Sequence, residues 1–456
     1  MKTHSRNFKR NFVSILFGAI GSQAMYVFMY NYSSIFFTDF LGLSAGLAGT
    51  IFMLSRVWDA INDPMCGAMI EKFNPKWGKI QTFMSIGGVI TAIGLVMLFT
   101  VPGFSGTGRA VWGAASYNIV GMAFTAVTVA TLLQMARGTR EPGERVGLSI
   151  SYSLGCSVTG IIIAMMITKG LAVFGSEDPA KGYQMVALLS AVLGLVFLIG
   201  SVILYRDQVS EDAAEAGVEE ESPKVLDMIK AVLRTPSFLI MVAAPCICNL
   251  GYGIVAGDLM YYLTYDLQKP ELMSMMLPAV YLGTLAGTFL AGYLSKYGKA
   301  RMIQVSFLIL AAGLAVRMIT GDASPVIACV FYAISNIGAG MMSTFLNPCL
   351  VDCADYAEYK TGTRCQALAL TGFTLVSKMA AGIGVGILGF FLQVGGYDGM
   401  AAVQTESAVN MIHLMQFWPG IIGALLGAVL LFFYKLDDKT METARAELAE
   451  RQRGEA

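Results

Sequence analysis

The segment Trp58-Asp59-Ala60-Ile61-Asn62-Asp63-Pro64 places two carboxylates and an amide within five residues, at the end of an otherwise apolar run. An arginine precedes the first carboxylate by about one helical turn. At about 100° per residue, the four polar side chains fall within roughly 120° of one helix face. These side chains are Arg56, Asp59, Asn62 and Asp63. Ionisable groups at membrane depth are costly, so the segment predicts a functional site.

A small monovalent cation or a proton fits this cluster. Two neighbouring carboxylates in a low dielectric repel each other, and a bound Na⁺ or H⁺ relieves that repulsion. Hard cations prefer oxygen ligands, which Asp59, Asp63 and the amide of Asn62 supply. The alternative is an internal ion pair between Arg56 and one aspartate that serves structure only. That alternative leaves the second aspartate unexplained.

The composition predicts a membrane protein around this cluster. The chain has 456 residues, of which 55% are hydrophobic and 14% charged, whereas soluble domains carry about 25% charged residues. Apolar runs near the bilayer-spanning length recur throughout, and lipid requires such runs to be helices. We expect an all-α fold of twelve transmembrane helices, at 12–38, 45–68, 80–101, 110–135, 146–168, 183–205, 236–265, 272–294, 300–320, 324–350, 366–394 and 405–434.

The charges predict the orientation. With both termini in the cytoplasm, 24 of the 31 Lys and Arg residues fall in cytoplasmic segments, and five, Arg317 among them, in outer segments. Positive charge is retained on the cytoplasmic side of a membrane. We therefore expect a multi-pass protein of the plasma (cytoplasmic) membrane. The net charge of zero says nothing about partners, and we expect no nucleic-acid partner.

A polar, acidic stretch at 206–235 divides the spans into six and six, and its composition is typical of a flexible linker. We therefore expect a first bundle at 1–205, a cytoplasmic linker at 206–235, a second bundle at 236–434 and a cytoplasmic tail at 435–456.

The two halves also resemble each other. Trp77-Gly78-Lys79 and Tyr297-Gly298-Lys299 stand 220 residues apart, each after the second span of its half. Two such halves are typical of the major facilitator architecture. The acidic face occurs only in the first half, so any ion site is asymmetric.

Two motifs carry a resemblance to a known family. The first runs from Gly42-Leu43-Ser44 through the acidic segment to Trp77-Gly78-Lys79. The second runs from Asp352 to Lys378 and includes Asp355-Tyr356, Glu358 and Arg364-Cys365. Their order and spacing resemble the glycoside–pentoside–hexuronide:cation symporters, to which melibiose permease belongs.

The resemblance implies a coupling-cation site at Asp59, Asn62 and Asp63, completed by Thr125 from the fourth span. It also implies that Lys378 lies close to these carboxylates, and a buried lysine needs such an anionic partner.

The sugar site departs from the melibiose-like pattern. Aspartates that hold sugar hydroxyls in that pattern correspond here to Gln23 and Thr128, and three further positions to Leu132, Ser149 and Ser343. We therefore do not expect recognition of galactosides. Gln23 can bind hydroxyls, or it can hydrogen-bond a neighbouring helix. A cavity with fewer carboxylates suits a neutral or anionic substrate, such as a uronide or a sulfonated sugar.

Other residues allow two readings. Asp258 is either a substrate contact that replaces a lost carboxylate, or a solvated group at the outer helix end. Tyr26 and neighbouring tyrosines either line a sugar cavity or serve packing. The charges Asp352, Asp355, Glu358 and Arg364 form either a solvated cluster or a lock between the halves.

Together these features predict a symporter that couples a glycoside or related sugar to Na⁺ or H⁺ by alternating access, working as a monomer without a cofactor. The alternative on the same fold is a transporter of an amphipathic lipid or other non-sugar solute. An enzyme is not expected, because no metalloprotease or nucleophile motif occurs and the chain has two histidines.

Overall fold

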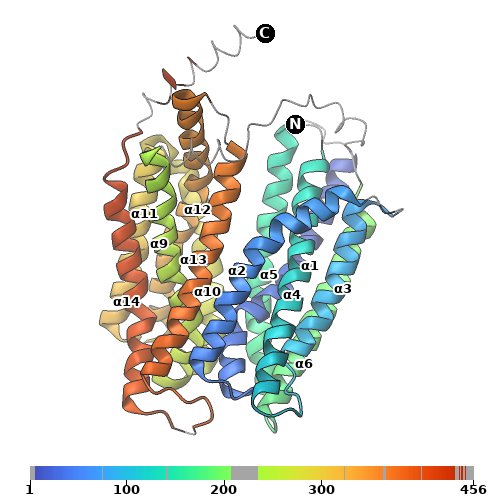
Figure 1. Ribbon diagram of the computed structural model, residues 1–456, viewed down its shortest axis with the longest axis vertical. Helices are drawn as coiled ribbons and strands as arrows, with labels where there is room; N and C mark the ends of the chain where they lie inside the picture. Colours follow the sequence, from blue (N-terminus) through green and yellow to red (C-terminus); the bar gives the residue numbers. More distant parts are fainter. Residues whose placement is uncertain are drawn as a thin grey trace. The chain divides into compact units, whose positions relative to one another are not determined.

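The computed structural model describes residues 6–73, 75, 77–139, 142–206, 235–322, 324–362, 366–401, 403–436, 441, 443–444 and 447. Within these residues there is no strand, and twelve long helices confirm the predicted all-α fold (Figure 1). The helices are α1 (Arg6–Asp39), α2 (Ala45–Lys72), α3 (Lys79–Leu98), α4 (Thr107–Arg137), α5 (Pro142–Phe174), α6 (Pro179–Leu204), α9 (Pro236–Tyr261), α10 (Met273–Leu294), α11 (Lys299–Thr320), α12 (Pro325–Thr361), α13 (Gln366–Val394) and α14 (Glu406–Leu431).

Nearly all of the predicted linker and tail lies outside the described residues, so these two segments stay predictions. Eleven of the described helices are long and apolar enough to cross a membrane. Among the twelve helices, α2 is not apolar enough to be counted with these eleven, and it carries Arg56, Asp59 and Asp63. Its polar face must therefore be satisfied by neighbouring helices rather than by lipid.

The chain forms two compact units. Unit 1 comprises Met1–Val218, Met260–Pro278 and Gly386–Ile412, and unit 2 comprises Glu219–Leu259, Ala279–Val385 and His413–Ala456.

In unit 1, α1 packs on α5 and α6, α3 packs on α4 and α6, and α2 packs on α4. Small residues permit the closest approaches. A Cβ added at Gly21 would lie 2.7 Å from the carbonyl oxygen of Gly194, and one added at Gly194 would lie 2.9 Å from that of Gly21. The outer part of α13 meets α2 in the same way, because a Cβ at Gly389 would lie 2.4 Å from the carbonyl oxygen of Ala45. Helices in lipid associate through such contacts.

One carboxylate organises the end of α1 in unit 1. Asp39 accepts hydrogen bonds from the hydroxyls of Thr38 and Tyr397 at 2.6 Å each, and from Tyr265 at 2.5 Å. Tyr265 belongs to a turn of π-helix that follows α9, and Tyr397 follows α13. Burial raises the pKa of Tyr397, and the neighbouring Tyr261 and Asp39 raise it further, so this phenol remains a donor.

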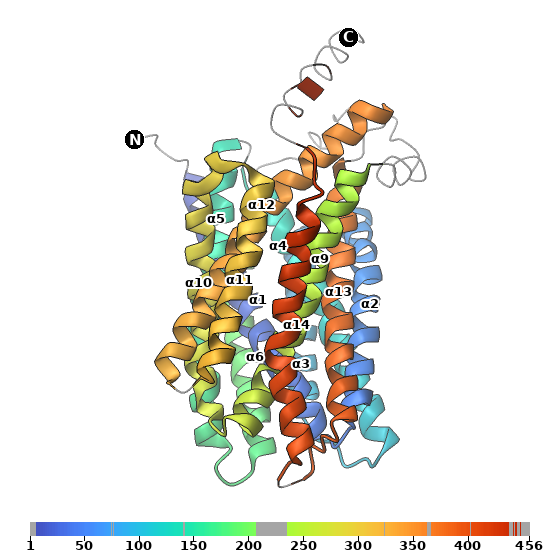
Figure 2. The ribbon, with the colours of Figure 1, turned by 90° about the vertical axis from the view of Figure 1, so that its left-hand side faces the viewer.

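In unit 2, α11 and α12 lie side by side along most of their length (Figure 2). Glycines again allow backbone contact between helices. Cβ atoms added at Gly283 and Gly287 of α10 would lie 2.2 and 2.1 Å from carbonyl oxygens of α12. A Cβ added at Gly251 of α9 would lie 2.2 Å from the carbonyl oxygen of Pro419 in α14.

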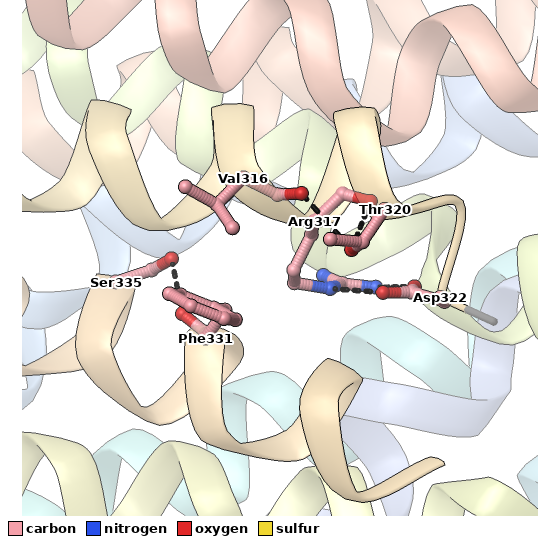
Figure 3. A network of polar contacts seen from close by, with 6 residues as sticks. All are labelled: Val316, Arg317, Thr320, Asp322, Phe331 and Ser335. Carbon is pink, nitrogen blue, oxygen red and sulfur yellow. Dashed lines mark hydrogen bonds and ion pairs between the residues drawn. The ribbon is translucent and has the colours of Figure 1, made fainter. Parts of the chain in front are cut away.

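A buried ion pair closes the turn after α11 in unit 2 (Figure 3). Arg317 donates from Nε to Asp322 Oδ1 at 3.2 Å and from Nη2 to Oδ2 at 2.6 Å, and both side chains are fully buried. The guanidinium also lies over the rings of Tyr332 and Phe417, at 4.5 and 5.3 Å from their centroids. Counting Arg317 among the residues of an outer segment was therefore wrong. The sequence shows its charge but not the partner that keeps it inside.

Replacing Arg317 by Met should lower the free energy of unfolding by about 3–5 kcal/mol, because it strands the buried carboxylate of Asp322. The measurement is the unfolding of detergent-solubilised protein. The exposed pair Lys181–Asp178, at 3.5 Å, supplies the control, since Lys181→Met should cost about 1 kcal/mol or less. Equal losses of unfolding free energy in Arg317→Met and Lys181→Met would contradict the structural role of the buried pair.

Candidate functional site

A row of polar contacts joins α2 to α4 inside unit 1. Asn118 Nδ2 donates to Ser55 Oγ at 2.9 Å. One turn along both helices, Asp59 faces Gly121. One further turn along, Thr125 Oγ1 donates to Asp63 Oδ1 at 3.0 Å. Residue numbers rise together on the two helices, so α2 and α4 run parallel here. The structure thus brings together Asp59, Asp63 and Thr125, as the sequence predicts.

Asp59 reaches the backbone of α4 because residue 121 is glycine. A Cβ at Gly121 would lie 2.8 Å from Asp59 Oδ1. On its other side, Asp59 Oδ2 lies 3.7 Å from Arg56 Nη1. The arginine therefore balances part of the charge of Asp59, and the predicted ion pair is present. Asp63, one turn further on, accepts from the hydroxyl of Thr125.

Asn62 lies on the same helix and is buried, with 6% of its surface exposed. Its Nδ2 atom is buried and has no hydrogen-bond partner among the described residues. Which amide atom is nitrogen and which is oxygen is assigned from hydrogen bonding. In the opposite orientation, the atom at this position is a carbonyl oxygen, which is a ligand for a hard cation.

Aromatic rings line the neighbouring face of α1. Tyr26 stacks on Tyr30 and on Phe124, with centroids 5.3 and 5.1 Å apart. The guanidinium of Arg56 lies 5.5 Å from the centroid of Tyr30. Tyr26 thus already packs against two rings, which supports the packing reading. The same rings hold Arg56 in place beside Asp59.

The other predicted substrate residues lie on four different helices. Gln23 is half-buried on α1. Thr128 donates its hydroxyl to the carbonyl oxygen of Phe124 at 3.0 Å, within its own helix. Asp258 is fully buried on α9, so its reading as a solvated helix-end group is wrong. Lys378 is half-buried on α13 in unit 2, and its contact with the carboxylates of α2 stays a prediction.

The charged residues of α12 are partly paired inside unit 2. Asp352 Oδ2 accepts from Lys299 Nζ at 2.6 Å. Asp355 is buried, with 9% of its surface exposed. Arg364 lies outside the described residues. The solvated reading is wrong for Asp352 and Asp355, and the predicted lock between halves stays a prediction.

Sequence reasoning missed the contacts of Gly121 and the Ser55–Asn118 hydrogen bond. The sequence does contain a signal for these contacts in the spacing of polar residues. Ser55, Asp59 and Asp63 recur every four residues, and Asn118 and Thr125 stand seven apart, so each set lies on one helix face. Pairing the two faces requires the knowledge that α2 and α4 are neighbours.

Known proteins resemble this chain over almost its whole length. It is 28% identical to the isoprimeverose transporter of Lactiplantibacillus pentosus, covering 89% of this chain and 84% of that one. It is 25% identical to the glucuronide carrier protein homolog of Escherichia coli, covering 92% and 90%. Among solved structures it resembles a bacterial homolog of the human lysosomal transporter Spinster, with a TM-score of 0.71 and 12% identity over 97% of this chain and 99% of that one.

The family model described as MFS/sugar transport protein matches residues 14–438. This match and the relatives named as a transporter and a carrier confirm the predicted family, and they confirm a transporter rather than an enzyme. The chain is a multi-pass membrane protein that belongs to the MFS/sugar transport protein family.

Proposed function

We propose that the protein carries a glycoside or related sugar into the cell together with a monovalent cation, Na⁺ or H⁺. The observation that carries the proposal is the contact between Asp63 and Thr125 beside the carboxylate of Asp59, in a chain of a sugar-transport family. Carboxylate, amide and hydroxyl oxygens gather here on two parallel helices. That set of ligands suits a hard monovalent cation.

The proposed coupling of cation and sugar follows from the charge of Asp59 and Asp63. Arg56 offsets negative charge at Asp59, and a bound cation is proposed to offset more of the charge of Asp59 and Asp63. A cation that favours sugar binding must, by thermodynamic linkage, itself bind better when sugar is present. Lys378 is proposed to compete with the cation for the same carboxylates. The protein is proposed to act as a monomer in the plasma membrane, with both termini in the cytoplasm.

The substrate class rests on two observations. The relatives are named for isoprimeverose and for a glucuronide, one neutral and one anionic. The galactoside-binding carboxylates correspond here to Gln23 and Thr128, and the hydroxyl of Thr128 is bonded within its helix. A neutral non-galactoside or an anionic glycoside is therefore the proposed substrate. No feature of the described residues favours the alternative of an amphipathic lipid.

Asp59→Cys and Asp63→Cys should each abolish cation-driven accumulation, because each removes a carboxylate of the site. The measurement is uptake of isoprimeverose and of methyl β-D-glucuronide into vesicles under an imposed Na⁺ or H⁺ gradient. Asp178→Cys, in an exposed pair outside the site, is the control for expression and insertion. Wild-type accumulation in both site variants would refute the proposed cation site.

Thr125→Val should separate the two candidate cations. The substitution keeps the shape of the side chain but removes a hydroxyl ligand, which Na⁺ needs and a proton on a carboxylate does not. If Na⁺ is the coupling ion, we expect its half-saturating concentration to rise about tenfold, which is about 1.4 kcal/mol. Thr131→Val is the matched control, since that hydroxyl bonds only the carbonyl oxygen of Val127. Equal responses to the two substitutions would show that Thr125 is not a Na⁺ ligand.

Gly121→Ala should weaken binding of the coupling cation without unfolding the α2–α4 pair. The new Cβ would lie 2.8 Å from Asp59 Oδ1, which is too close, so the carboxylate at the end of this side chain must shift. Gly67→Ala on α2 is the control, because a Cβ added at Gly67 meets no described neighbouring atom within 4 Å. Cation dependence of uptake is the readout. An unchanged cation affinity in Gly121→Ala would show that the position of Asp59 is not critical for cation binding.

A further inference from the structure

Unit 2 holds a buried polar cluster that the candidate cation site does not use. Asp258 of α9 is fully buried, and so is Gln416 of α14. His413 stands one turn before Gln416 on α14 and is half-buried. Carboxylates and histidines inside membrane-spanning helices are costly and are typical of proton relays. The cluster therefore indicates a function of its own.

The helices α9 and α14 run antiparallel in close contact. A Cβ added at Gly427 of α14 would lie 2.9 Å from the carbonyl oxygen of Ala244 in α9. One added at Gly251 of α9 would lie 3.3 Å from Cα of Gly420 in α14. Residue numbers therefore rise on one helix as they fall on the other, and the glycines bring the two backbones together.

This register places Asp258 opposite the α14 residues of the cluster. Seven residues, about two helical turns, return to the same face of a helix. That step leads from Gly251 to Asp258 on α9, and from Gly420 back to His413 on α14. A Cβ added at Gly420 would also lie 2.8 Å from Cγ2 of Val255, which stands about one turn before Asp258. The contact between the helices thus continues toward the cluster.

A buried ion pair and aromatic rings border the cluster. The centroid of the His413 ring lies 5.3 Å from that of Phe417, and the guanidinium of Arg317 lies 5.3 Å from the same ring. Among the described residues of unit 2, the titratable and charged groups around His413 are Asp258 on α9, Arg317 and Asp322 at the end of α11, and Cys329 and Tyr332 on α12.

Charge selects the ligand of the cluster. Arg317 and Asp322 bond each other, which leaves the carboxylate of Asp258 and the imidazole of His413 to exchange a proton. With one proton between them, these two groups have no net charge, whereas loss of that proton leaves a buried anion, which is costly. Histidine is also the side chain that ordinarily titrates between about pH 5 and 8. A proton is therefore the ligand that suits this pair.

Gln416 supplies a hydrogen-bond donor and acceptor beside the pair. Its side chain is fully buried, and neither Nε2 nor Oε1 has a hydrogen-bond partner among the described residues. Buried amides are nearly always hydrogen-bonded, so this amide is available to a changing neighbour. Because residues three apart on a helix are neighbours, Gln416 can accept from a protonated His413 or donate to a deprotonated one.

We propose that Asp258 and His413 form a proton-binding pair in unit 2, separate from the cation site of α2 and α4, with Gln416 as its hydrogen-bonding neighbour. Asp258 stands three residues before the end of α9, and His413 seven residues after the start of α14. In the proposed orientation these ends lie on the outer side, so the pair takes its proton from outside and makes transport depend on external pH.

The inference goes beyond the proposed function, because it adds a site that neither the sugar nor the cation of α2 occupies. It also gives Asp258 a role other than the substrate contact that the sequence allowed.

The first test measures proton binding without transport. The chain has two histidines, so His4→Gln leaves His413 as the single imidazole for NMR titration of ¹⁵N-histidine-labelled protein, purified in detergent without a histidine tag. Asp258→Asn should weaken proton binding at His413 at least tenfold, because the imidazolium loses an anionic neighbour. Asp258→Glu should keep most of the affinity. Asp178→Asn, at an exposed carboxylate of unit 1, is the matched control and should change nothing.

Thermal unfolding of each variant shows whether the fold is kept. An unchanged proton affinity of His413 in folded Asp258→Asn would overturn the pair.

The second test follows exchange of isoprimeverose across vesicles at saturating Na⁺, with pH varied from about 5 to 8. His413→Gln and Asp258→Asn should each flatten the pH dependence of the wild type. The double variant should match either single variant, because all three lose the same site. Wild-type pH dependence in folded His413→Gln would overturn the inference.

A sugar contact by Asp258 would give a different result. Asp258→Asn would then raise the half-saturating sugar concentration at every pH, and His413→Gln would leave it unchanged, which would overturn the inference. A wild-type protein that accumulates no glycoside would refute the proposed function, whereas the proton affinity of His413 would still decide this inference.

Discussion

The central constraint on this molecule is the cost of placing carboxylates where lipid surrounds the helices. Asp59 and Asp63 cannot face lipid, so α2 must lie against a helix that offers polar partners. α4 does so through Asn118 and Thr125, and through the space left at Gly121. The parallel α2–α4 pair is therefore both the structural solution for α2 and the frame of the proposed cation site.

The second unit solves the same problem by pairing charges locally. Arg317 and Asp322 neutralise each other in a buried turn, where aromatic rings cover the guanidinium. Lys299 and Asp352 also pair, but at the wall of a cavity. The two pairs therefore differ in exposure, since the first is fully enclosed and the second lies partly exposed.

The two units differ in the polar groups that they offer. The α2–α4 face brings together the carboxylates of Asp59 and Asp63 beside Arg56, and this is the face proposed to bind a cation. The described lining of the cavity in unit 2 contains one cation and one anion, Lys299 and Asp352. The two halves of the chain thus carry different sets of polar groups.

The sequence by itself determined the helical membrane fold, the number of long helices and the residues of the acidic face, because hydropathy and helical period are local properties. It also determined that Asp59, Asn62 and Asp63 share one face. The resemblance to a family implied that this face meets Thr125 of the fourth span. Only the tertiary structure showed the further contacts at Asn118 and Gly121, because helix neighbours are chosen by packing between residues distant in sequence. For the same reason the burial of Arg317, and the ion pair of Lys299 with Asp352 across 53 residues, could not be predicted from composition or spacing.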